Sequence, residues 1–400
     1  MKRRLGNIPD NWSWESSGEV IDVRDGTHDT PKYVSEGFPL VTSKNLKPQG
    51  IDFADVGFIS KGDHVAISKR SHVDRGDILF AMIGTIGNPT IVDDDREFSI
   101  KNVALFKCTK GRVEPQFWYR MLGSPLVKMQ LDDATRGGTQ KFVSLKVLRN
   151  LQIPLPPLDE QKRIAGILDA ADTLRTKRRE SLAQLDILLQ STFLDMFGDP
   201  VINPMGWDVR ELAEVVETGT IVTYGIVQAG DEYPGGIPYI RTGDLVEGEV
   251  QLEGLRHTDP EIAAKFERSR VCAGEIVMSI RATVGTTARV PSQLDGANLT
   301  QGTARISPGE DTVPSFLLSF IRSQGSQAWL RRQVKGATFR EITLKRLRQM
   351  PIHVPPIDLQ RRFATIVESI EQQKTSQRAH LDELDTLFVS LQSRAFRGDL

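Results

Sequence analysis

The chain has 400 residues, of which 39% are hydrophobic and 26% charged, and its formal net charge is −1. This length favours two or three globular domains. The near-neutral charge excludes a protein that binds DNA through bulk basicity, so any grip on nucleic acid would come from local patches or from a partner.

Targeting and redox signals predict a cytoplasmic protein. Met1 to Arg4 precede Leu5 and Gly6 rather than an apolar run, so we expect no secretory signal. No window approaches about 18 apolar residues, the length that predicts a membrane span. Cys108 and Cys272 stand one in each half. We expect both to be buried thiols of a reducing compartment, with no zinc site.

Residues 1–157 predict a first mixed domain of strands and helices. After Pro9 and Trp12, β-branched residues alternate with turn dipeptides, and strand-like runs cover residues 77–83 and 103–107. A shared apolar face predicts one helix from Pro115 to Met129.

Residues 158–198 predict one long helix, on which the rest of the chain depends. Prolines at 154, 156 and 157 keep the backbone extended, so the helix begins after them, with Asp159 as its N-cap. Apolar residues then recur at alternating steps of three and four until Gly198 and Pro200, which predicts about 38 helical residues with a coiled-coil seam. The seam residues that we single out are Ile164, Ile167, Leu174 and Leu185.

Residues 199–356 repeat the order of landmarks of the first domain, about 195 to 200 residues later, and residues 357–400 predict a second long helix. Residues 26–33 nevertheless show no counterpart in residues 221–228, so the framework repeats while the loops differ. The seam of the second helix recurs at Phe363, Ile366, Ile370 and Leu384.

Both seams turn polar in their central turns, at Arg178 in the first helix and at Gln373 and Gln377 in the second. These residues meet if the helices pair antiparallel with their centres aligned. The alternative is that each helix packs on its own domain. We therefore predict an α+β protein, in which two mixed α/β domains in pseudo-twofold arrangement are separated by an antiparallel coiled coil that also docks partners.

Catalytic and metal-binding patterns are missing from the sequence. Residues 57–62 have the spacing of a phosphate loop, but Asp63 follows where a lysine is required. The six histidines are scattered, and Asp93 to Asp95 are typical of a solvated turn. We expect no catalytic residue, no metal and no cofactor on this chain.

The remaining polar residues suit nucleic-acid recognition. Cations and amides on flexible loops reach phosphates and base edges, and two such loops stand at equivalent places of the repeat. They contain Arg136, Thr139, Gln140 and Lys141 in the first half, and Arg332, Lys335, Thr338 and Arg340 in the second. Further candidates are Ser43, Lys44, Asn45, Lys101, Asn102, Arg241, Thr242, Arg281, Asn298 and Gln301. The alternative for each residue is a solvated or structural side chain.

The segment PLPPLDEQKRIAGILDAAD, its echo VPPIDLQRRFATIVESIE, and the segments at 24–31 and 237–244 resemble the DNA-specificity subunit of Type I restriction-modification systems. That resemblance implies that each variable domain reads one half of a bipartite DNA sequence. It also implies two modification subunits that use S-adenosylmethionine, and restriction subunits that use ATP and Mg²⁺. The rival interpretation is a protein-binding scaffold with duplicated domains on a coiled-coil rod.

Overall fold

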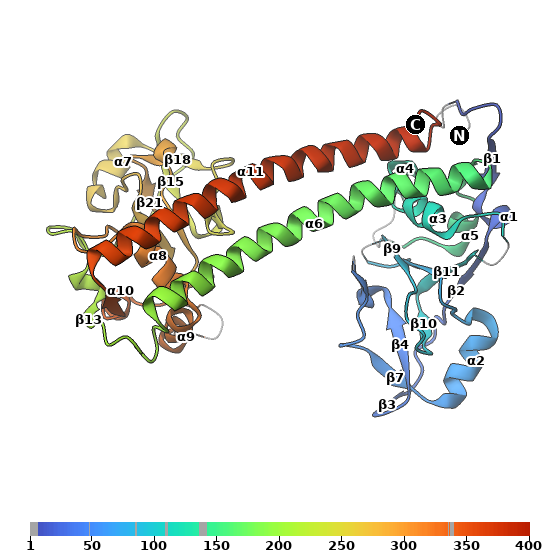
Figure 1. The fold of residues 1–400 in the computed structure, drawn as a ribbon, viewed down its shortest axis with the longest axis horizontal. Coiled ribbons are helices and arrows are strands. Elements are labelled where there is room, and N and C mark those ends of the chain that lie inside the picture. Colours follow the sequence, from blue (N-terminus) through green and yellow to red (C-terminus); the bar gives the residue numbers. More distant parts are fainter. Residues whose placement is uncertain are drawn as a thin grey trace. The chain divides into compact units, whose positions relative to one another are not determined.

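The computed structural model describes residues 7–47, 49–84, 86–108, 111–334 except 136–141, 336 and 340–400, with Thr135 described by its backbone alone. The chain divides into two compact units. The first unit comprises Met1–Arg179 with Ala379–Leu400, and the second comprises Glu180–Arg378. Two long helices, α6 (Leu158–Phe197) and α11 (Ile357–Ala395), contribute a part to each unit (Figure 1).

In the first unit, two sheets carry the globular part. One has the strand order β2-β11-β8-β9 and the other β10-β4-β7-β3, while β1 pairs antiparallel with β12 and β5 with β6. The strands are β1 (Ser13–Ser16), β2 (Asp22–Asp25), β3 (Tyr33–Val34), β4 (Phe38–Thr42), β5 (Leu46–Lys47), β6 (Gly50–Ile51), β7 (Gly57–Ile59), β8 (Ile78–Ala81), β9 (Gly87–Ile91), β10 (Ser99–Lys101), β11 (Val103–Lys107) and β12 (Gln152–Leu155). The short helices are α1 (Ser17–Val20), α2 (Lys61–Ser71), α3 (Pro115–Leu122), α4 (Pro125–Thr135) and α5 (Leu145–Arg149).

The second unit repeats this plan with the sheets β14-β22-β19-β20 and β18-β15-β21, and with the pairs β13-β23 and β16-β17. The strands are β13 (Asp208–Glu211), β14 (Thr223–Tyr224), β15 (Ile237–Ile240), β16 (Leu245–Val246), β17 (Glu249–Val250), β18 (Arg256–Thr258), β19 (Ile276–Ser279), β20 (Thr287–Arg289), β21 (Asn298–Leu299), β22 (Thr303–Ile306) and β23 (Pro351–Val354). The short helices are α7 (Pro260–Ala264), α8 (Pro314–Arg322), α9 (Gln324–Gln333) and α10 (Leu344–Arg348). The prediction of two mixed domains is confirmed.

The predicted strands at 77–83 and 103–107 are present as β8 and β11, which pair antiparallel. The single helix from Pro115 to Met129 is wrong, because the chain there forms α3 and α4. Gly123 ends α3, and the Ser124 hydroxyl accepts a hydrogen bond from Val127 N at 3.3 Å in the first turn of α4. Pro125 then starts the new helix, where its missing amide costs no hydrogen bond.

The long helices begin at Leu158 and Ile357, directly after the proline pairs. The Pro157 carbonyl accepts from Gln161 N at 3.0 Å, so Pro157 is the N-cap and Asp159 lies inside the first turn. The prediction of Asp159 as the cap is therefore wrong, although its charge still faces the positive end of the helix. Helix α6 has 40 residues and α11 has 39, close to the predicted length.

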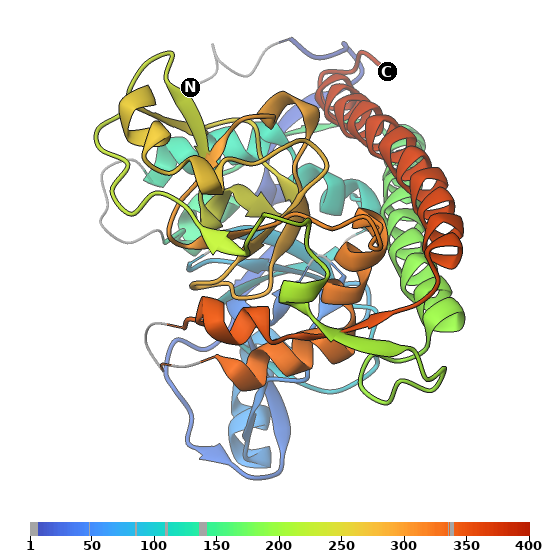
Figure 2. The ribbon, with the colours of Figure 1, turned by 90° about the vertical axis from the view of Figure 1, so that its left-hand side faces the viewer.

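Within each unit, α6 and α11 run antiparallel and side by side (Figures 1 and 2). In the first unit Arg179 bonds Asp385 at 2.9 Å, while Arg163, earlier in α6, donates to the Leu400 carbonyl at 3.0 Å. In the second unit Lys374 pairs with Asp186 at 2.9 Å, while the Phe193 and Phe363 rings lie 5.6 Å apart. These pairs run in opposite directions along the two helices, so antiparallel pairing is confirmed in both units.

The seam itself differs from the prediction at three positions, one of which is Gln373, exposed on α11. Leu174 is 55% exposed and Ile366 37% exposed, so neither lies in the seam. Arg175 takes the facing position instead, because its guanidinium bonds Asp385 and lies 4.3 Å from the Phe388 ring centre. Ile164, Phe363 and Ile370 are buried as predicted, and Ile167, Arg178, Leu185, Gln377 and Leu384 are half-buried.

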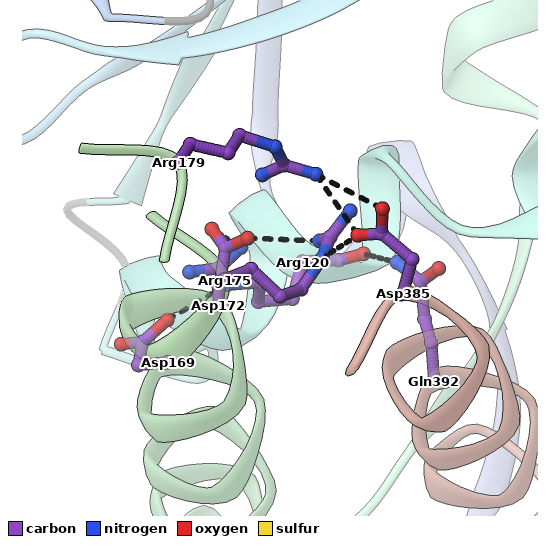
Figure 3. A network of polar contacts seen from close by, with 7 residues as sticks. All are labelled: Arg120, Asp169, Asp172, Arg175, Arg179, Asp385 and Gln392. Carbon is purple, nitrogen blue, oxygen red and sulfur yellow. Dashed lines mark hydrogen bonds and ion pairs between the residues drawn. The ribbon is translucent and has the colours of Figure 1, made fainter. Parts of the chain in front are cut away.

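A charged network fastens the first globular domain to the helix pair (Figure 3). Arg120 of α3 bonds Asp169 at 2.7 Å and Asp172 at 2.8 Å, both on α6. Its own carbonyl accepts from Gln392 of α11 at 3.2 Å. Burial opposes the charge, but the bonds to Asp172 and Asp169 raise the pKa of Arg120 above its ordinary value. One residue of the domain therefore holds both helices, α6 through its side chain and α11 through its carbonyl.

A buried glutamine joins each long helix to its domain in the same way. The Gln161 amide accepts from Glu114 N at 2.9 Å and donates to the carbonyls of Arg112 and Pro156 at 3.2 and 2.9 Å. Gln360 forms the equivalent bonds with Val313 N, Asp311 O and Pro355 O, at 2.9, 3.1 and 2.8 Å, in the same order. Both glutamines are at most 1% exposed, so this joint is part of the repeated framework.

The two thiols differ in environment. Cys108 is half-buried, whereas Cys272 is exposed, so the prediction that both are buried is wrong for Cys272. Burial, with the charges of Asp77 and Glu114, raises the pKa of Cys108 to about 12. Among the described residues, no helix is long and apolar enough to cross a membrane.

Candidate nucleic-acid interface

A cavity of about 560 Å³ on the first unit collects four of the predicted residues, which are Ser43, Lys44, Lys101 and Asn102. The remaining lining residues are Tyr33, Thr42, Leu46, Lys47, Ile83, Gly84 and Asn88. Three lysines beside amide and hydroxyl groups can bind phosphate oxygens and base edges.

Two neighbouring parallel strands carry this cavity. Strand β4 ends in a 3-10 turn at Ser43–Asn45, and β10, paired parallel to β4, leads into Asn102. Asn102 has φ 55°, a left-handed conformation that asparagine tolerates well. The Ser43 hydroxyl donates to the Asn102 carbonyl at 3.2 Å, which ties the two strand ends together.

A hydrogen-bond chain approaches Asn102 from β2. Asp25 is 3% exposed and pairs with Arg70 of α2 and with His28 Nε2, the latter at 2.9 Å. His28 Nδ1 lies 3.1 Å from Asn102 Oδ1. Lys101 Nζ donates to the Thr30 hydroxyl. The side chains of the segment at 25–30 therefore orient the two residues at the end of β10.

The same backbone arrangement occurs in the second unit, although the sequences differ. Thr27 N donates to Ile100 O at 3.0 Å, and Ile226 N donates to Leu299 O at 2.7 Å. A Cβ at Gly26 or at Gly225 would overlap the carbonyl of Ile100 or Leu299, so this close approach requires glycine. The prediction that residues 26–33 lack a counterpart in 221–228 is wrong for the backbone. The two segments share their main-chain hydrogen bonds, although their side chains differ.

One predicted residue of the second unit, Thr242, contacts the segment that carries another, Gln301. Thr242 donates its hydroxyl to Gly302 O at 3.3 Å, and the Gly302 carbonyl also accepts from Ile280 N at 2.8 Å. In sequence, Gln301 precedes Gly302 and Arg281 follows Ile280.

The side chains on this shared backbone differ between the units. In the first, an isolated bridge joins Ile83 to Phe142, which are 40% and 44% exposed. In the second, the bridge joins Arg281 to Glu341, whose side chains form an ion pair at 3.2 Å. Arg340 is exposed, and its carbonyl accepts from Ala282 N at 3.0 Å. One unit offers an apolar pair where the other offers charges.

Three further predicted residues form hydrogen bonds within the protein. The buried Asn45 amide accepts from Thr42 N and Oγ1 at 3.0 and 2.8 Å and donates to two carbonyls. Buried Asn298 accepts from Ser269 Oγ at 2.6 Å and donates to Ala263 O at 3.3 Å. The Arg241 guanidinium bonds Asp244 at 2.7 Å, and this bond raises the pKa of Arg241. Their hydrogen-bonding groups serve the turns around the site in this structure, and contact of these three residues with DNA stays a prediction.

Several predicted loop residues lie outside the described residues, namely Arg136, Thr139, Gln140, Lys141, Lys335 and Thr338. Arg332 is exposed on α9. Sequence reasoning missed Asp25 and His28 as site residues, although both belong to the segment 24–31 that carries the family resemblance. Among the described residues, no group of three or more histidine, cysteine, aspartate or glutamate side chains could hold a metal ion.

Comparison with known sequences identifies relatives over the full chain. The chain is 27% identical to the Type I restriction enzyme EcoBI specificity subunit of Escherichia coli, covering 99% of this chain and 88% of the relative. It is 24% identical to the putative Type I restriction enzyme MjaX specificity subunit of Methanocaldococcus jannaschii, covering 92% and 89%.

Solved structures share the fold. A chain from a study of complex assembly and conformational transition of the type I R-M system superposes with a TM-score of 0.58 at 21% identity, covering 98% of this chain and all of that chain. The Type-I restriction-modification system S subunit from M. genitalium gives 0.53 at 15% identity, covering 98% of each chain. The model of the Type I restriction modification DNA specificity domain matches residues 9–184 and again 204–385. With two such domains spanning most of its length, the chain belongs to the family of Type I restriction-modification DNA specificity subunits.

Proposed function

We propose that each of the two domains reads one half of a bipartite DNA sequence. The observation that carries this proposal is the repeated strand-end site, where one backbone arrangement presents Lys101 and Asn102 in one unit and Gln301 in the other. Shared backbone with different side chains suits a protein that reads two unlike half-sites.

The chain acts as the specificity component of a larger complex. The helix pair would set the unread spacer between half-sites and dock two modification subunits. These would supply S-adenosylmethionine-dependent adenine methylation, and restriction subunits that use ATP and Mg²⁺ would supply cleavage. The chain itself would catalyse neither reaction, and the complex would act on DNA in the cytoplasm.

A selection experiment tests this function. The chain is co-purified with its modification subunits and mixed with a library of randomised DNA duplexes, and the retained duplexes are sequenced. We expect a consensus with two specified parts and an unspecified spacer of fixed length. If the complex retains all duplexes equally, or none, a protein-binding scaffold replaces this proposal.

The loops test which domain reads which half. Changing Arg136 and Lys141 to alanine should weaken one half-site alone, and changing Lys335 and Arg340 to alanine should weaken the other. Each lost base contact should reduce discrimination by about 1–3 kcal/mol. Equal losses at both half-sites from either double variant would contradict the assignment of one domain to one half.

A further inference from the structure

We infer that Asn102 and Gln301 are equivalent base-reading residues, each specific for adenine at one position of its half-site, and that His28 is a positioning residue for Asn102 alone. This inference rests on the proposed function and names the residues that would carry it.

One backbone hydrogen bond is shared by the two positions, although Asn102 has φ 55° and Gln301 is not left-handed. Asn102 N donates to Thr27 O at 3.1 Å, and Gln301 N donates to Ile226 O at 2.9 Å. The strand-end turn of the first unit also contacts this position, through Ser43 Oγ on Asn102 O, whereas in the second unit Thr242 Oγ1 bonds the carbonyl of Gly302, one residue after Gln301. Both residues are half-buried, so each amide has a fixed backbone and a side chain that DNA can reach.

An amide side chain matches adenine in the major groove. Adenine presents N7 as an acceptor and the N6 amino group as a donor, and an asparagine or glutamine amide pairs with both at once. Lys44 and Lys101 line the same cavity as Asn102, so phosphate-binding cations stand beside the amide.

His28 restricts the Asn102 amide. The Asp25 carboxylate only accepts hydrogen bonds, so His28 Nε2, 2.9 Å away, carries a proton. The other ring nitrogen then meets the Asn102 amide at 3.1 Å. Whichever end of the amide faces Nδ1, the opposite edge keeps one acceptor and one donor, the pair that adenine requires. Asp25 is itself paired with Arg70, so the position of the His28 imidazole is set before DNA binds.

The second unit lacks this restraint. Val227 follows Ile226 where His28 follows Thr27, and Val227 is 49% exposed. An aliphatic side chain cannot hold an amide by a hydrogen bond. Gln301 therefore enters the complex with more rotamer freedom than Asn102, and we expect weaker discrimination at its base pair.

Sequencing of duplexes retained from the randomised library measures each base preference in the intact complex. Asn102→Gly removes the amide and suits the left-handed backbone, which alanine would strain. It should reduce the adenine preference at one position of one half-site by about tenfold or more, with other positions unchanged. Asn102→Asp should shift that preference toward cytosine, whose N4 group donates to a carboxylate. Gln301→Ala should affect one position of the other half-site.

His28→Ala should weaken the preference at the Asn102 position, yet add nothing when combined with Asn102→Gly, because a positioning residue acts only through its target. Lys44→Ala is the matched control and should lower retention without changing any base preference. If the double variant lost base preference by the product of the two single losses, His28 would act independently of Asn102, and its positioning role would be overturned. Unchanged base preferences in Asn102→Gly would overturn base reading by Asn102. If Asn102→Gly does not assemble with its partners, Asn102→Asp decides the question. A wild-type complex that selects no bipartite sequence rejects the proposed function itself.

Discussion

Single amides in this chain have opposite roles that their sequence neighbours do not reveal. Asn45 and Asn102 each follow a lysine, yet Asn45 is 2% exposed with its amide bonded to backbone, whereas Asn102 lines a cavity. The difference depends on which strand ends meet, and this is a property of the folded sheet. Sequence alone therefore predicted the region of the site but not which of its amides are available.

Gln161 and Gln360 should each contribute to stability. Replacing either by leucine leaves buried backbone groups without partners, which should lower the free energy of unfolding by about 1–3 kcal/mol. Gln190→Leu on the exposed face of α6 is the control and should change stability little. Denaturant unfolding of the purified variants gives these values. Equal stability of Gln161→Leu and the control would show that the joint is dispensable.

The thiols should react at different rates. With its pKa raised to about 12, Cys108 holds roughly one thiolate in ten thousand at pH 8, since that pH lies four units below the pKa. Exposed Cys272 should take up N-ethylmaleimide within the native protein, and Cys108 only after unfolding. Peptide mass spectrometry locates the label. Rapid native labelling of Cys108 would contradict its burial.

At the scale of elements, apolar spacing predicted the long helices well, and prolines marked their beginnings within one residue. The apolar pattern gave the wrong residue at one seam position. Arg175 faces α11 there, through its ion pair with Asp385 and its contact with the Phe388 ring, while Leu174 is exposed. Burial opposes ionisation of Asp385, but the hydrogen bond and charge of Arg175, with Arg179, lower the pKa of that carboxyl. Periodicity counts apolar residues and cannot anticipate such an ion pair.

Arg120 should matter more than a surface arginine. Arg120→Met removes the bonds to Asp169 and Asp172, of which Asp172 keeps Arg175 at 2.9 Å, and should destabilise the first unit by about 1–3 kcal/mol. The Arg120 side chain is 12% exposed, whereas Arg163, which pairs with Glu160, is 44% exposed. Arg163→Met should therefore cost below about 1 kcal/mol. Thermal unfolding compares the two, and equal losses would refute the special role of the network in Figure 3.

At the scale of the whole molecule, the repeat predicts a fixed distance between the two half-sites on DNA. Residues 178–184 and 377–383 lie between the Arg175–Asp385 contact of the first unit and the Asp186–Lys374 contact of the second. Deleting both heptads shortens each helix by about 10 Å, which corresponds to about three base pairs. The selected spacer should shorten accordingly while both half-site sequences persist. An unchanged spacer would exclude the helices as its determinant.

The close approach of Gly26 and Gly225 to the carbonyls of Ile100 and Leu299 has a consequence for how such proteins diversify. Main-chain hydrogen bonds hold the backbone there, and they do not depend on the side chains that project from it. Substitutions at the neighbouring positions can therefore change DNA recognition without causing misfolding. A lineage could acquire a new DNA preference through exchanges at Gln301, or at Asn102 to residues that accept its left-handed backbone, while inheriting its architecture intact.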